Sequence, residues 1–194
     1  MLDEQHALSS SLALLVIDVQ TGAFDGQRCP PIAEADRLLS TTQGLIAAAR
    51  AASAPVIHVQ HGENVAGEVF EEGSAQWHIH PSVAPAAGEL VVRKRESSAF
   101  AGTALEAELR QRGITTLAVC GLQSEHCVTN TTLAALERGF GVLLAHDGHS
   151  TWPGASQTAP QIIQQQNELL AARGAQPLAC RDIESRFAAA ANDA

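Results

Sequence analysis

The sequence predicts an α/β protein in which helices cover both faces of an open parallel sheet. Short apolar runs rich in β-branched residues alternate along the chain with segments of helical periodicity. Strands that alternate with helices form right-handed βαβ units, which align the strands in parallel. The chain has 194 residues, of which 45% are hydrophobic and 17% charged, so it is long enough to bury one core. We expect a single domain over residues 1–194.

The first half of the chain is expected to contain three strands and one long helix. Residues 12–17, LALLVI, form an uninterrupted apolar run, which is typical of a strand buried on both faces. Apolar residues recur at helical spacing over 35–52, and further strands are expected at 55–60 and 89–92.

The second half continues the alternation. A short helix is expected over 103–112, where Thr103 and Glu106 fit a capping box. The remaining expected elements are strands at 115–120, 142–145 and 177–180, a helix after Cys127, a helix over 155–172 and a terminal helix.

The stretch 61–88 departs from this pattern. It is rich in glycine and proline and has little periodicity. A loop of this length inside a compact domain is usually functional, so we expect it to form a wall of the binding pocket.

Composition limits the partners and the compartment. The formal net charge of −9 argues against nucleic acid, which is bound through clustered lysines and arginines. The longest apolar run is far shorter than the ~20 residues of a membrane span. The N-terminal residues carry acids where an export signal carries lysines. The four cysteines lack CxxC spacing, which favours a reducing cytoplasm over a disulfide framework. They are Cys29, Cys120, Cys127 and Cys180.

The segment 118–139, AVCGLQSEHCVTNTTLAALERG, is the most informative part of the chain. An apolar strand ends at Gly121, a polar turn follows with Ser124 as a candidate N-cap, and a helical pattern runs to Gly139. Cys127 therefore lies in the first turn of a helix, where free N–H groups and the macrodipole favour thiolate over thiol. This arrangement predicts a nucleophilic cysteine.

Two further reactive residues follow predicted strands. Asp18 closes the first strand, and Lys94 follows the third. Taken singly, Asp18 fits a helix cap, Lys94 fits a solvated basic patch and Cys127 fits a buried inert thiol. However, the carboxyl ends of parallel strands meet at one edge of the sheet, where ligands bind. Convergence of the three residues at that edge favours a catalytic set.

Three segments carry a family resemblance, and they occur in the family's order. They are LLVIDVQTGAF at 14–24, VVRKRESSAF at 91–100 and VCGLQSEHCVTNTTLAALERGFGVLLAHDGHST at 119–151. They resemble the isochorismatase-like cysteine hydrolases, which include nicotinamidases and N-carbamoylsarcosine amidohydrolase. The resemblance implies a three-layer αβα fold with a six-stranded parallel sheet in a Rossmann-like arrangement. It also implies a homo-oligomer, either a dimer or a tetramer.

The resemblance further implies a mechanism. Asp18 would accept the thiol proton, Lys94 would hold the anions by charge, and Cys127 would attack an amide carbonyl to give a thioester. A non-proline cis peptide is implied between Leu122 and Gln123. The backbone N–H groups of Gln123 and Cys127 would form the oxyanion hole.

The residues around the substrate are predicted less directly. Gln20 and Phe24 lie beside Asp18 in the first family segment, and Trp77 lies in the long loop. We expect these three to border the pocket, with core packing as the alternative for the two aromatic residues. For Trp152, core packing is favoured over a place in the pocket wall, and His149 is expected to be structural.

Several histidines around the long loop raise the question of a metal. Nicotinamidases bind a metal through an Asp-x-His pair and a further histidine, whereas the chain reads HVQHGEN after its second strand. We therefore expect no metal and no cofactor, and we do not expect nicotinamide to be the substrate. The histidines concerned are His58, His61, His78 and His80.

The resulting hypothesis is a cysteine hydrolase that cleaves the C–N bond of a small amide, ureido or carbamoyl compound. An isochorismatase-type vinyl ether hydrolase, which does not need the cysteine, is the first alternative. A ligand-binding protein that keeps the fold without turnover is the second. A nucleotide-binding protein is disfavoured because no glycine-rich phosphate loop follows the first strand.

Overall fold

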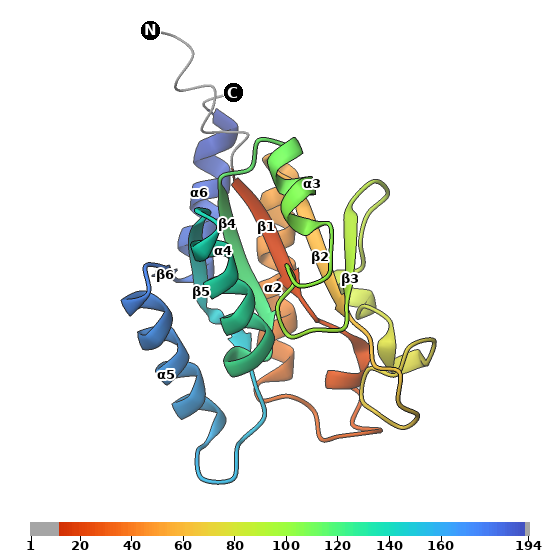
Figure 1. Ribbon diagram of the computed structural model, residues 1–194. Helices are drawn as coiled ribbons and strands as arrows, with labels where there is room; N and C mark the ends of the chain where they lie inside the picture. The colour runs from red at the N-terminus through yellow and green to blue at the C-terminus, as the bar shows by residue number, and fades with distance from the viewer. Residues whose placement is uncertain (1–11, 193–194) are drawn as a thin grey trace, which may run out of the picture.

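The computed structural model describes residues 12–192 (Figure 1). The expectation about an export signal concerns the N-terminal residues 1–11, which lie outside the described residues. Along the described part of the chain, no helix is long and apolar enough to span a bilayer.

A six-stranded, all-parallel sheet forms the centre of the molecule, as predicted. The spatial order is β3-β2-β1-β4-β5-β6. The strands are β1 (Leu12–Ile17), β2 (Val56–His61), β3 (Leu90–Lys94), β4 (Thr116–Leu122), β5 (Gly141–Ser150) and β6 (Gln176–Leu178). The chain builds outward from β1 to β3 and then crosses back to add β4 on the other side of β1. The topological switch point therefore lies between β1 and β4, which is where open α/β sheets bind ligands.

Helices cover both faces of the sheet (Figure 1). Helices α2 (Ala35–Ala51) and α6 (Cys180–Asn192) pack on one face. The other face carries α3 (Leu105–Gln111), α4 (Thr129–Glu137) and α5 (Ala159–Ala172). This arrangement confirms the three-layer fold that the resemblance implies.

Successive side chains of β1 point to opposite faces of the sheet, and both faces are covered, which explains why the strand is apolar throughout. Leu14 and Val16 belong to the core beneath α2 and α6, whereas Leu15 and Ile17 belong to the core beneath α3 and α4. Every residue of β1 is buried. Each large side chain removed from water contributes about 1.5–3 kcal/mol, so β1 stabilises the cores on both faces of the sheet.

The connection between β2 and β3 contains no α-helix. It includes only the short 3₁₀ turns Ala75–Trp77 and Pro81–Val83. This segment is the long loop predicted from its composition.

Local details of three predicted elements differ from the structure. The capping box at Thr103 is absent, because the carboxylate of Glu106 pairs with Arg138 at 3.0 Å and with Arg110 at 3.5 Å, and the N-cap residue of α3 has no side-chain cap hydrogen bond. Helix α5 begins at Ala159, where the backbone N–H of Thr158 donates to Gln161 Oε1 at 2.9 Å. Strand β5 extends to Ser150 because its second half continues the pairing with β4 beyond a register shift.

Candidate active site

The three predicted catalytic residues meet at the carboxyl edge of the sheet. Lys94 is the last residue of β3, Asp18 follows β1, and Cys127 lies in the π-helical turn Ser124–Val128 between β4 and α4. Asp18 has a left-handed φ of 52°, a conformation that Asp tolerates better than most residues. The chain thus leaves β1 abruptly at the acid.

Gly121 allows the strands on either side of the site to approach closely. Its φ is 120°, which an L side chain rarely adopts. A Cβ at this position would overlap the carbonyl oxygen of Ile17 in β1. The next peptide bond, between Leu122 and Gln123, is cis, as the resemblance implies.

Lys94 contacts the other polar residues of the site. Its ammonium nitrogen lies 2.7 Å from Asp18 Oδ2, 3.1 Å from Cys127 Sγ and 3.3 Å from His61 Nδ1. An ammonium has three N–H donors, and each has a neighbour here. Lys94 is 3% exposed and Asp18 is 2% exposed, so the ion pair is shielded from water and from salt screening.

The protonation state of Cys127 differs from the sequence-based prediction. Burial, followed by the neighbouring Asp18 carboxylate, raises the pKa of Cys127 to about 11, and Lys94 only partly offsets this rise. Burial alone would lower the pKa of Lys94, but Asp18 and Cys127 raise it overall. The resting site at neutral pH therefore contains a thiol beside a lysinium ion. The prediction of a resting thiolate was wrong because it considered the helix start and left out burial and Asp18.

His61 is a further member of the site, although the sequence suggests it only as a possible metal ligand. Burial, and then the positive charge of Lys94, lower its pKa, so the imidazole is neutral at neutral pH and Nδ1 accepts from the ammonium. Its position at the end of β2, the strand between β1 and β3, was the available signal.

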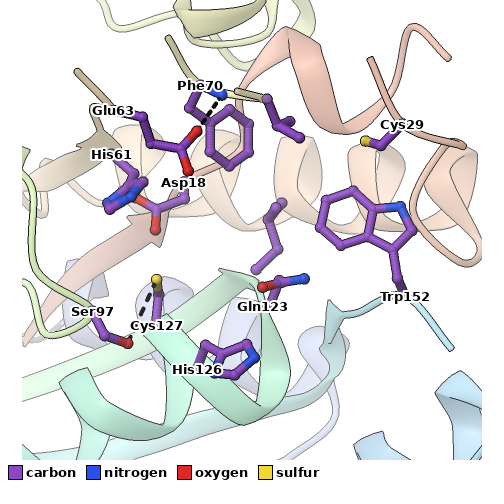
Figure 2. Close-up of a pocket in the computed structure, with 12 residues that line it drawn as sticks. Asp18, Cys29, His61, Glu63, Phe70, Ser97, Gln123, His126, Cys127 and Trp152 are labelled. Atoms are coloured by element: carbon purple, nitrogen blue, oxygen red, sulfur yellow. Dashed lines mark hydrogen bonds between the residues drawn. The ribbon is translucent and has the colours of Figure 1, made fainter. Parts of the chain in front are cut away.

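A cavity of about 410 Å³ opens in front of Cys127 (Figure 2). Asp18, Gln123 and Cys127 line it together with the aromatic rings of Phe70 and Trp152. Small-molecule sites are typically about 300–1,000 Å³, so this one suits a small substrate. Its other lining residues are Cys29, His61, Glu63, Val69, Ser97, Leu122 and His126.

Gln20, which was expected in the pocket, is fully buried behind it. Its amide nitrogen donates to the carbonyl oxygens of His61, at 2.9 Å, and Trp77, at 2.7 Å. Its amide oxygen accepts from the backbone N–H of His61 at 2.8 Å. A carboxamide has both donors and an acceptor, so Gln20 fixes the end of β2 instead of facing the substrate.

Phe24 and Trp77 also lie outside the lining of the cavity. The ring of Phe24 packs against His80 at 5.1 Å between centroids. The guanidinium of Arg93 lies 5.0 Å above the ring of Trp77. Both rings pack against the core beneath α2 and α6, which is the alternative that the sequence left open.

Trp152 packs against the core beneath α2 and α6, as expected, and it also lines the cavity. Its indole N–H donates to the carbonyl oxygen of Pro30 at 2.6 Å, which orients the ring. Trp152 follows the end of β5, so the strand-end rule could have identified it. Phe70 and Glu63 come from the first part of the long loop, where no periodic signal marks them.

The turn before Cys127 is held by a buried histidine. Ser124 is not an N-cap, because its hydroxyl is hydrogen-bonded to His149 Nδ1 at 2.8 Å. His149 Nε2 is hydrogen-bonded to Asn167 Oδ1 at 2.9 Å. Burial lowers the pKa of His149 to about 4. This neutral, fully buried histidine has the structural position that was expected of it.

The four histidines considered as metal ligands each make a different contact. His58 is hydrogen-bonded to Glu89 at 3.1 Å, His61 lies beside Lys94, His78 packs near Trp77 and His80 accepts from Ser82. Within residues 12–192, no three His, Cys, Asp or Glu side chains gather as metal ligands would.

Comparisons with known proteins place this fold and site in a family. The family model of the isochorismatase domain matches residues 12–172. A streptothricin hydrolase from Streptomyces noursei is 45% identical over 156 residues, covering 78% of this chain and 55% of that protein. The match to a second streptothricin hydrolase from the same organism covers 61% of its length. The chain thus spans between half and two thirds of these two relatives.

More distant relatives agree with this placement. A ureidoacrylate amidohydrolase, RutB, from Methylobacterium radiotolerans is 28% identical over 174 residues, covering 72% of this chain and 67% of that protein. The crystal structure of an isochorismatase from Pseudomonas putida superposes with a TM-score of 0.82 at 28% identity and covers 90% of both chains. The matched residues include β1, β3 and the turn of Cys127. The chain therefore belongs to the isochorismatase domain family.

Proposed function

We propose that this protein is a cysteine-dependent amidohydrolase that cleaves the C–N bond of a small amide, ureido or carbamoyl compound. One observation carries the proposal. In a cavity of small-molecule size, a buried ammonium lies 2.7 Å from a carboxylate oxygen of Asp18 and 3.1 Å from the sulfur of Cys127. Acid–base group, cation and nucleophile are thus in contact before substrate binds.

Acylation begins with a proton transfer. The thiol proton of Cys127 passes to the Asp18 carboxylate as the sulfur electron pair attacks the carbonyl carbon. The C=O π electrons move to oxygen and give a tetrahedral oxyanion. Because the resting thiol has a raised pKa, the proton leaves as the C–S bond forms, and Lys94 stabilises the sulfur while it carries negative charge.

Collapse of the intermediate releases the amine. The C–N bond breaks, the nitrogen takes the proton from Asp18, and a thioester remains on Cys127. Asp18 then removes a proton from water as the water oxygen attacks the thioester carbon. The C–S bond breaks, the sulfur takes the proton back, and the acid is released with the site restored.

The oxyanion is assigned to the backbone N–H groups of Gln123 and Cys127. Both residues line the cavity on the same turn. Loss of one such donor typically costs about 10²–10³-fold in rate, so the fixed backbone of this turn matters as much as its side chains.

The relatives support C–N cleavage over the alternatives. One of them is named an amidohydrolase and others are named streptothricin hydrolases. A vinyl ether hydrolase does not require the thiol, whereas Cys127 here has Lys94 and Asp18 placed around it. A protein that only binds ligand has no need to bury this ion pair, since desolvating two charges costs free energy.

Ammonia release from a panel of small amides, ureides and carbamoyl compounds tests the proposal. Cys127→Ala is expected to lower turnover by at least ~10³-fold, because the covalent route is lost. The matched control is Glu68→Gln, an exposed position on the long loop, which should keep wild-type turnover. Turnover by Cys127→Ala within tenfold of wild type would refute the covalent mechanism.

A further inference from the structure

The carboxylate of Glu63 is a feature of the cavity that the proposed chemistry does not use. Glu63 lies in the long loop just beyond β2 and lines the same cavity as Cys127 (Figure 2). Its Oε2 accepts from the backbone N–H of Phe70 at 2.7 Å, and its own N–H donates to the Phe70 carbonyl at 3.0 Å. These two bonds close the segment 63–70 and fix the carboxylate in the cavity wall.

Glu63 differs from its acidic neighbours in the same loop. Glu71 pairs with Arg28 at 2.7 Å, and Glu72 pairs with Arg95 at 3.0 Å. Glu63 forms no ion pair with any residue in the described part of the chain, and its Oε1 accepts no hydrogen bond there. The nearby arginines are therefore engaged, and one carboxylate remains available to a ligand.

The other charged and titratable groups around the cavity do not neutralise the Glu63 carboxylate. No arginine or lysine lines the cavity, and the ammonium of Lys94 is already shared among Asp18, Cys127 and His61. His61 is neutral at neutral pH because burial and Lys94 lower its pKa. Among the described residues, the lining thus contains the carboxylates of Asp18 and Glu63 and no lysine or arginine.

We propose that Glu63 selects amide substrates that carry a cationic group, such as an ammonium or a guanidinium. The inference rests on the proposed amidohydrolase function and names its substrate class. The cation would lie against Glu63, where a charge-assisted hydrogen bond is stronger than a neutral one. The faces of Phe70 and Trp152 offer additional cation–π attraction. A dicarboxylate, in contrast, would meet the repulsion of Glu63 without a compensating cation.

Three amides of matched length test this proposal. They are 5-aminopentanamide, hexanamide and adipic acid monoamide, which share a carboxamide and four methylene groups and carry a cationic, neutral or anionic end. For wild-type protein, kcat/KM from ammonia release is expected to be at least ~10-fold higher for the cationic amide than for hexanamide, with the anionic amide lowest. Glu63→Gln is expected to remove the cationic preference, so that kcat/KM falls at least ~10-fold more for the cationic amide than for hexanamide.

Two further variants test whether the preference depends on the charge at position 63. Glu63→Lys is expected to reverse the order in favour of the anionic amide. Glu68→Gln removes one negative charge from the same loop at an exposed position and should keep the wild-type order. An equal fall for all three amides in Glu63→Gln would show that Glu63 acts only through its bond to Phe70 and would overturn the proposal, as would equal wild-type rates on all three.

Binding to Cys127→Ala separates this proposal from the proposed chemistry. Calorimetry is expected to give tighter binding of 5-aminopentanamide than of hexanamide, and the difference should disappear in Cys127→Ala/Glu63→Gln. If the cation preference appears in binding while wild-type protein releases no ammonia, the amidohydrolase function fails and charge selection stands. Equal binding of 5-aminopentanamide and hexanamide to Cys127→Ala overturns charge selection whatever the turnover.

Discussion

The ammonium of Lys94 determines the electrostatics of the site at the scale of single residues. The ammonium lies 2.7 Å from Asp18 and 3.1 Å from Cys127. Its attraction for a thiolate is therefore partly cancelled by the negative charge of Asp18. Burial of the thiol and repulsion from the carboxylate then prevail, so the pKa of Cys127 rises to about 11. In the proposed mechanism the carboxylate that raises this pKa is also the base that removes the proton, so the thiol stays protonated until substrate arrives.

Asp18→Asn is predicted to separate reactivity from turnover. The carboxylate raises the pKa of Cys127, so its removal lowers that pKa and leaves Lys94 to stabilise the thiolate. Alkylation of Cys127 by iodoacetamide near pH 7.5 should therefore become about tenfold faster or more. Amide turnover should fall by about 10²–10⁴-fold, because the general base is lost. Peptide mapping of the alkylated protein and an ammonia assay measure the two effects.

The pH dependence of the wild-type protein provides the control. Without substrate, the alkylation rate of Cys127 should rise about tenfold per pH unit from pH 7 towards pH 10, because the thiolate fraction rises in that proportion below the pKa. A rate that is already at its plateau at pH 7, or slower alkylation in Asp18→Asn, would contradict this description of the charges.

At the scale of elements, the close approach of β1 and β4 depends on Gly121. Gly121→Ala places a Cβ against the backbone of Ile17 and requires an unfavourable φ of 120°. We expect the free energy of unfolding to fall by at least ~2 kcal/mol. Gly139→Ala is the control, because its φ is 79° and a Cβ there meets nothing within 4 Å. Urea unfolding should show a clearly smaller loss for Gly139→Ala, and equal losses would argue against strand contact as the cause.

The buried His149, which links the Cys127 turn to α5, predicts a pH dependence of stability. Its pKa is lowered to about 4 in the folded protein, whereas an unfolded histidine titrates near 6.5. Between these values the unfolded state binds a proton that the folded state does not, so stability falls as the pH drops. This group alone should remove about 3 kcal/mol between pH 7 and pH 4. Urea unfolding of His149→Gln should show a weaker dependence in this range, and an unchanged dependence would assign the effect to other groups.

For the whole molecule, the sheet and the meeting of Asp18, Lys94 and Cys127 could be predicted because each depends on a local pattern. The apolar run of β1 ends at Asp18, and the strand-turn-helix pattern marks Cys127. The rule that parallel strands end at one edge joins them to Lys94. Each of these signals is a short stretch of sequence, and no long-range packing is needed to recognise it.

The cavity walls could not be predicted in the same way. Glu63 and Phe70 lie in a loop without periodicity, and their pairing depends on how that loop closes. Gln20 lies next to the catalytic acid in sequence, yet it faces three backbone groups from β2 and the long loop. The pKa of Cys127 depends on burial and on Asp18, which only the folded chain brings together.

Assembly with identical subunits stays a prediction that follows from the family resemblance. Light scattering coupled to size-exclusion chromatography should give the mass of a dimer or a tetramer of the 20.3 kDa chain. A mass of one chain over the working concentration range would refute it. Location in the cytoplasm likewise stays a prediction from the cysteine pattern.

Intact-protein mass spectrometry after acid quenching tests the central claim, the covalent role of Cys127, most directly. During turnover of an amide substrate, wild-type protein should gain the mass of the acyl group, and the modification should map to the peptide that contains Cys127. Cys127→Ala should gain nothing, and hydroxylamine should remove the adduct from wild-type protein, as expected for a thioester. Rapid turnover with the acyl group on another residue, or undiminished turnover by Cys127→Ala, would contradict the account.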